Sequence, residues 1–138
     1  MKTEIKRILQ EDATGCGLAC IAMIVGETYA DVKKVALENE ILEEKRTYYT
    51  KSSHLIDLLG HFDFKADKGR MVKHWSSIQS LSIVAINYKE STDSWHWVLY
   101  VPDENLGYVL DPHKKIKTDK RVDFSRMRVR SYIPIESI

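Results

Sequence analysis

The sequence has no long apolar run, few cysteines and almost no net charge, and each of these absences narrows what the chain can be. Its 21 Lys and Arg against 20 Asp and Glu give a net charge of +1, so nothing favours nucleic acid as a partner. No segment is long enough to cross a bilayer, and no basic stretch precedes an apolar run at the N-terminus. We therefore expect neither a membrane anchor nor a signal peptide, and any membrane partner should be another chain.

The two cysteines, Cys16 and Cys20, lie only four residues apart. A disulfide across one helical turn would close almost no loop and add little stability, so we expect a reducing compartment. A zinc site is disfavoured because no second cysteine pair and no close histidine pair accompanies them. Their spacing also differs from the C-x-x-C of redox pairs. The sequence therefore predicts neither a metal nor a cofactor.

The hydrophobic content of 43% suits one domain over residues 1–138, and the apolar period changes halfway along the chain. Apolar residues at helical spacing predict helices in the first half, and alternating or β-branched stretches predict strands in the second. The expected helices are 17–25, 28–42 and 52–60, and the expected strands are 62–66, 78–88, 95–101, 108–110 and 127–135. Helices followed by strands indicate an α+β fold, with an antiparallel sheet packed against the first helix.

The first expected helix is apolar on every side, which implies that it is buried on every side. We expect Thr14 to cap its start and Gly26 to end it. Cys16 lies at this start between Gly15 and Gly17, where the missing side chains let the backbone turn sharply and let another molecule approach. A thiol there feels the positive end of the helix dipole, which favours the reactive thiolate. The alternative is that the thiol is simply a small buried hydrophobic group.

Residues 95–112 predict a hairpin that brings an imidazole to a carboxylate. If Val101 pairs with Leu106 across a four-residue loop, the antiparallel register places His96 directly opposite Asp111. Both side chains then lie on one face, within cross-strand reach. Such a carboxylate would fix the tautomer of the imidazole and stabilise its protonated form.

Cys16, His96 and Asp111 have the residue types of a nucleophile, a general base and a group that orients the base. Gln10 could turn its amide toward the same point and, with the backbone N–H of Cys16, hold an oxyanion. Taken singly, these residues also have structural interpretations: a strand histidine, a turn residue before proline and a surface glutamine. Their occurrence together favours a cysteine-dependent reaction.

At these positions the sequence resembles the C39 peptidases, papain-like cysteine peptidases that process bacteriocins and peptide pheromones. The motifs that carry the resemblance are Gln10-x5-Cys16-Gly17, His96-Trp97-Val98 and Asp111-Pro112. The resemblance implies a papain-like fold, with Cys16 as nucleophile, His96 as general base and acid, Asp111 as its orienter and Gln10 as oxyanion donor. Gly15 departs from the family, which usually has an acid before the cysteine.

The resemblance also implies a substrate and partners. Family members typically cut a leader peptide after a Gly-Gly pair, which requires a narrow cleft beside Cys16 and an apolar groove for the leader. They often form a domain of an ABC exporter, so the implied partners are a precursor peptide and an exporter in another chain. The implied location is the cytoplasm, at the inner face of the membrane where the exporter lies.

Two alternatives to a peptidase remain open. The same thiol could transfer its acyl group to an amine, which would make the protein an acyltransferase. The domain could also bind leader peptides for an exporter without cleaving them, in which case Cys16 has no need to react fast with alkylating reagents. Trp95 and Trp97, which alternate with His96, are predicted to pack in the sheet or to border a peptide groove.

Overall fold

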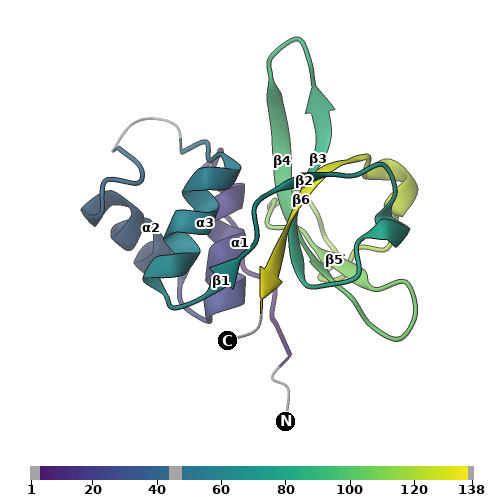
Figure 1. Cartoon of the computed structure of the whole chain (residues 1–138), viewed down its shortest axis with the longest axis horizontal. Helices are drawn as coiled ribbons and strands as arrows, with labels where there is room; N and C mark the ends of the chain where they lie inside the picture. The colour runs from purple at the N-terminus through teal and green to yellow at the C-terminus, as the bar shows by residue number, and fades with distance from the viewer. Residues whose placement is uncertain (1–3, 44–47, 137–138) are drawn as a thin grey trace.

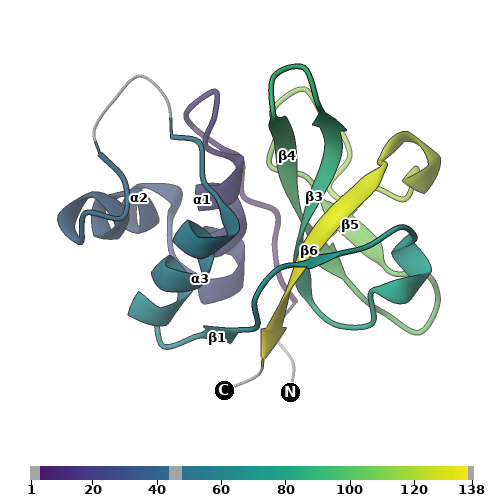
Figure 2. The same cartoon turned by 45° about the horizontal axis from the view of Figure 1, so that its top comes forward.

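A computed structural model describes residues 4–43 and 48–136, which form three α-helices beside an antiparallel sheet (Figure 1, Figure 2). The helices are α1 (Cys16–Val25), α2 (Tyr29–Glu38) and α3 (Ser52–His61). The strands are β1 (Lys65–Ala66), β2 (Arg70–Met71), β3 (Ser82–Lys89), β4 (Ser94–Val101), β5 (Tyr108–Leu110) and β6 (Val129–Glu136). The expected α+β arrangement is confirmed.

The sheet has the order β1-β6-β3-β4-β5, and β2 also pairs with β6. The five expected strands are present, but β3 starts four residues later than expected because Ile78 ends a short 3-10 helix, Trp75–Ser77. β2 was not expected, since its two side chains are exposed and leave no apolar alternation in the sequence. No helix within the described ranges is both long and apolar enough to span a membrane.

α1 lies between the other two helices and β4, which explains why its apolar residues cover every side (Figure 1). Residues 17–24 are all buried, and full burial of a side chain such as Leu18 or Ile21 contributes about 2 kcal/mol. Gly26 ends the helix as expected, in the left-handed conformation with φ 75°, and its N–H donates to the Ala22 carbonyl.

The start of α1 differs from the expectation. The residue at the N-cap position is Gly15, and no side chain caps it. Thr14 instead accepts a hydrogen bond from the backbone N–H of Tyr48 at 2.7 Å, so it joins α1 to the segment before α3 rather than capping the helix. The predicted cap at Thr14 is wrong because a partner distant in sequence occupies its hydroxyl.

The two glycines beside Cys16 are in tight internal contacts. A Cβ at Gly15 would lie 1.9 Å from the hydroxyl oxygen of Tyr29, and one at Gly17 would lie 2.1 Å from Oγ1 of Thr50. The protein's own side chains fill the two spaces that a Cβ would occupy, while approach of another molecule to Cys16 itself stays a prediction. The glycines let α1 pack against its neighbours in this chain.

The remaining helix ends follow local chemistry. The Thr28 hydroxyl caps α2 by accepting from the Asp31 N–H at 3.0 Å. α2 ends four residues before the expected position because the N–H groups of Ile41 and Leu42 both turn back to the Ala36 carbonyl. α3 starts at Ser52, where the expected start was placed, and runs one residue beyond Gly60.

Candidate active site

Cys16 lies where the helical layer meets the sheet. It is the first residue of α1, its side chain is partly exposed, and the backbone N–H of Trp97 on β4 donates to its Sγ at 3.4 Å. Because α1 is anchored on all sides, the sulfur is held at a fixed point beside β4. The other cysteine, Cys20, lies one turn further along the helix and is fully buried in the core.

His96 on β4 and Asp111 just after β5 are hydrogen-bonded, with 2.7 Å between Nε2 and Oδ1. The predicted register between these strands is wrong, because Val101 pairs with Tyr108 rather than with Leu106. The resulting shift is two residues, and since side chains alternate with a period of two, His96 and Asp111 stay on one face. They are diagonal neighbours instead of directly opposite.

The wider turn between β4 and β5 has a local cause. The Asp103 carboxylate accepts the N–H of Asn105 at 2.7 Å and that of Gly107 at 2.9 Å, and Gly107 has φ 77°. A side-chain oxygen thus satisfies the backbone of the turn, and glycine provides the left-handed residue that ends it. This arrangement extends the loop from four residues to six.

The Asp111 carboxylate is almost completely buried and has a partner at each oxygen. Oδ1 also accepts the backbone N–H of His113 at 2.9 Å, and Oδ2 accepts Nη1 of Arg121 at 2.7 Å. Burial raises the pKa of Asp111, but the bonds from His96, His113 and Arg121 outweigh it and keep the pKa below its ordinary value. Asp111 is therefore ionised at neutral pH.

His96 interacts with both the carboxylate and the thiol. Burial favours its neutral ring, but the hydrogen bond with Asp111 and the interaction with the Cys16 thiol outweigh burial and raise the pKa of His96 to about 9. The ring is therefore protonated at neutral pH. An imidazolium beside a sulfur stabilises the thiolate, which is the nucleophilic form of cysteine.

Gln10 is buried rather than at the surface, with 5% of its area exposed. Its Nε2 donates to the carbonyls of Asp12 at 3.0 Å and Ala13 at 2.9 Å, while its Oε1 has no hydrogen-bond partner among the described residues. The side chain therefore holds the loop that leads into Cys16. Both amide protons are engaged in that loop.

The segment before Cys16 is also joined to the chain after Asp111. The Gln10 backbone N–H donates to the Pro112 carbonyl at 2.9 Å. Arg7 donates from Nε to the Asp111 carbonyl at 2.6 Å, and from Nη2 to the carbonyls of His113 at 2.9 Å and Ile116 at 2.6 Å. These bonds connect the part of the chain that carries the thiol to the part that carries the carboxylate.

The acidic group close to Gly15 is the carboxylate of Asp12, so it does not come from position 15 itself. The Tyr29 hydroxyl fills the space beside Gly15 and donates to Asp12 Oδ2 at 2.6 Å, and Lys33 Nζ lies 3.2 Å from the same carboxylate. Burial and the Asp12 carboxylate raise the pKa of Tyr29 well above its ordinary value, so the hydroxyl stays protonated and donates. The sequence did not indicate this cluster, because its members are as many as 21 positions apart.

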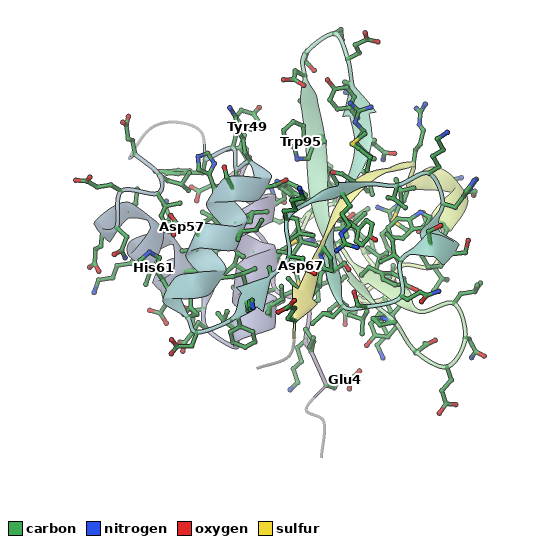
Figure 3. The ribbon with its side chains drawn as sticks, in the orientation of Figure 1. Glu4, Tyr49, Asp57, His61, Asp67 and Trp95 are labelled. Atoms are coloured by element: carbon green, nitrogen blue, oxygen red, sulfur yellow. The ribbon has the colours of Figure 1, made fainter. Side chains whose placement is uncertain are left out.

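A cavity of about 540 Å³ opens beside Cys16 between the helical layer and the β3–β4 hairpin. Tyr49, on the helical side, and Trp95, on β4, both line the cavity and lie below the tip of the β3–β4 hairpin in the view of Figure 3. The residues that line the cavity are Thr14, Cys16, Tyr49, Thr50, Lys51, His54, Lys89, Thr92, Asp93, Ser94, Trp95 and Trp97. Both tryptophans therefore border a cavity at the thiol, and Trp97 is also part of the core.

The sequence matches the peptidase C39 family over residues 4–127. No curated protein gives a significant match. One similar solved structure is a double glycine motif protease from an AMS/PCAT transporter in complex with the leader peptide. It has a TM-score of 0.66 and 19% identity, over 98% of this chain and 93% of that one. Another is the peptidase domain of Streptococcus ComA, a bi-functional ABC transporter of a quorum-sensing pathway, with a TM-score of 0.66 and 14% identity over 98% and 100% of the two chains.

Proposed function

Because the chain belongs to the peptidase C39 family, we propose that it is a cysteine endopeptidase that cuts a leader peptide after a Gly-Gly pair. The observation that supports this proposal most directly is that His96, hydrogen-bonded to Asp111, also interacts with the Cys16 thiol, which lines an open cavity. The imidazolium and the buried carboxylate provide what a thiolate nucleophile needs.

In the proposed reaction, the Cys16 thiolate attacks the carbonyl carbon of the second glycine and forms a tetrahedral intermediate. The peptide C–N bond then breaks as His96 gives its proton to the leaving amine, which leaves an acyl group on the sulfur. Water attacks this thioester while His96 takes the water's proton. The carboxylic acid product leaves and the thiolate is restored beside a protonated His96, which Asp111 keeps oriented.

The oxyanion of both intermediates requires hydrogen-bond donors. The backbone N–H of Cys16 is in the first turn of α1, where N–H groups have no partner within the helix, and we assign it as one donor. We assign Gln10 Nε2 as the other. Since that nitrogen donates to Asp12 and Ala13 in the free protein, the assignment requires one of these bonds to be exchanged for the substrate oxyanion.

Replacing Gln10 with alanine tests this assignment. We expect kcat to fall by about 100-fold with little change in KM, because loss of one oxyanion donor typically costs about that much. Gln79→Ala is the matched control, since Gln79 is exposed and is the only other glutamine. The assignment is wrong if Gln10→Ala keeps kcat within about threefold of wild type, because oxyanion donors act on the transition state.

The substrate and partner assignments are supported by the solved structures of similar fold. One of those proteins is described with its leader peptide bound, and both come from ABC transporters. We therefore propose a precursor peptide as substrate and an ABC exporter in another chain as partner, with the protein at the cytoplasmic face of the membrane. The aromatic walls of the cavity offer contacts for the peptide beside Cys16.

A panel of synthetic precursor peptides tests the function. We expect a single cut after the Gly-Gly pair, and a fall in rate of at least about 100-fold when valine replaces the second glycine, because a misplaced carbonyl loses the benefit of orientation. Mass spectrometry with a small amine present separates hydrolysis from acyl transfer. Equal cutting of glycine and valine peptides, an amide product alone, or binding without cleavage would each contradict the proposal.

A further inference from the structure

The Arg121 guanidinium connects the Asp111 carboxylate to a second carboxylate. Its Nη1 donates to Asp111 Oδ2 at 2.7 Å, while Nε and Nη2 donate to the two oxygens of Asp123 at 2.9 and 2.8 Å. Its side chain is only 11% exposed, and the Asp111 side chain is 1% exposed. A charge-assisted bond at such a buried site has strong directional preference.

The backbone delivers Arg121 to this position. Arg121 forms an isolated antiparallel bridge with Val109 on β5, with hydrogen bonds of 2.8 and 2.9 Å in the two directions. Side chains on a strand alternate between faces, so Asp111, two residues after Val109, lies on the same face as Val109 and its partner. The contact between Arg121 and Asp111 therefore follows from the pairing of the chain.

We propose that Arg121 is a positioning residue for the cleavage reaction, which fixes the rotation of the Asp111 carboxylate and offsets its negative charge at His96. This inference rests on the proposed function, because it assumes that His96 acts at Cys16. With Arg121 on Oδ2, the carboxylate presents Oδ1 to His96 and cannot turn without losing a buried charged partner. The imidazole is thereby held in one orientation toward the sulfur.

The charged and titratable groups around His96 and Asp111 determine in which direction the pH dependence of cleavage changes when Arg121 is replaced. His96 is faced by Cys16 and Asp111, and by the ring of His113 at 6.0 Å between centroids. Asp111 is faced by Arg121 and, at its carbonyl oxygen, by Arg7.

Removing the positive charge at residue 121 makes the site more negative by one unit, which favours the protonated form of His96. Loss of a proton at a more negative site is less favourable in general, so both limbs of the pH profile should move to higher pH.

The experiment compares Arg121→Met with Arg121→Lys, and uses the exposed Arg128→Met as control. Two quantities are measured against pH: kcat/KM for peptide cleavage and the rate of Cys16 alkylation by iodoacetamide. For Arg121→Met we expect the midpoints of both limbs of the pH profile to move up by about 0.5 to 1 pH unit. We also expect kcat to fall about tenfold with KM nearly unchanged. Arg121→Lys keeps the charge, so its limbs should stay at the wild-type pH while kcat falls.

Asp123→Asn provides a second test that keeps the bond between Arg121 and Asp111. It removes a negative charge next to Arg121, so the limbs should move slightly to lower pH, opposite to Arg121→Met. This variant remains informative if Arg121→Met does not fold, which thermal unfolding would show. Limbs that stay at the wild-type pH in the folded Arg121→Met protein, or an Asp123→Asn shift to higher pH, would overturn the inference.

The alkylation measurement separates this inference from the proposed function. If wild-type protein cleaves no peptide but its alkylation limb moves as expected in Arg121→Met, the peptidase assignment fails and the role of Arg121 at the Asp111–His96 pair stands. If wild-type protein cleaves peptide and neither limb moves, the role of Arg121 fails alone.

Discussion

Replacing Cys16 with alanine should abolish peptide cleavage, with kcat/KM lowered by about 10⁴-fold or more, because no other group can form the acyl intermediate. Of the two cysteines, Cys16 is the one that is partly exposed and that interacts with His96. The measurement is cleavage of the Gly-Gly peptides, followed by mass spectrometry under single-turnover conditions. Binding of the peptide should be retained, since the change removes one sulfur atom from an otherwise intact cavity.

Cys20→Ala is the matched control for this experiment. Cys20 lies on the same helix, is fully buried, and burial raises its pKa, so it stays a neutral thiol. Its replacement should cost about 1 kcal/mol of unfolding free energy through the small cavity it leaves. Cleavage should remain within about threefold of wild type. Equal activity of the Cys16→Ala and wild-type proteins would end the assignment of Cys16 as nucleophile.

Replacing His96 with asparagine should lower kcat/KM by about 10³-fold, a typical contribution of a general acid–base. The variant loses the proton donor for the leaving amine and the positive charge beside the sulfur. Alkylation of Cys16 at pH 7 should therefore also slow, because a positive charge beside a sulfur supports the thiolate form that reacts. The two measurements together distinguish loss of the base from a general loss of structure.

His61→Asn is the control for His96. His61 is exposed at the end of α3, where it lies 3.7 Å from Asp57 (Figure 3), and it does not line the cavity beside Cys16. Its replacement should change neither cleavage nor alkylation. An unchanged alkylation rate in His96→Asn would mean that the imidazole does not support the thiolate, and the proposed role of the Cys16–His96 pair would be wrong.

The sequence predicted the elements whose cause is local. The apolar run of α1 and the alternation in β4 are visible in the residues themselves, and Gly26 ends α1 by its own backbone freedom. The register of β4 and β5 was not predictable, because it depends on how the Asp103 side chain bonds inside its turn. The hydroxyl of Thr14 was misassigned for a similar reason, since its partner Tyr48 is 34 positions away.

In the candidate site, too, features with a local cause were predictable from the sequence, and contacts between distant residues were not. The spacing of the motifs predicted that His96 and Asp111 lie on one face of the sheet. This prediction holds although the predicted register is wrong, because the register differs by an even number of residues. Arg7 and Arg121 were not identified, because a polar residue in an irregular segment gives no sign of its partner. Arg7 reaches the Asp111 carbonyl across 104 positions, and Arg121 reaches the carboxylate through a single isolated bridge. Only the folded chain reveals these contacts.

The bonds from Arg7 and Gln10 join the segment that leads into α1 to the chain that follows β5. These two segments cannot move apart without breaking the charge-assisted bonds that the Arg7 guanidinium donates to three carbonyl oxygens. On the cavity side, the Trp97 indole N–H donates to the Thr50 carbonyl at 3.0 Å, so the segment before α3 is also joined to β4, whose hairpin with β3 projects beyond the rest of the sheet (Figure 1). The backbone segments that carry Cys16 and Asp111 are therefore fixed relative to each other without any bound peptide.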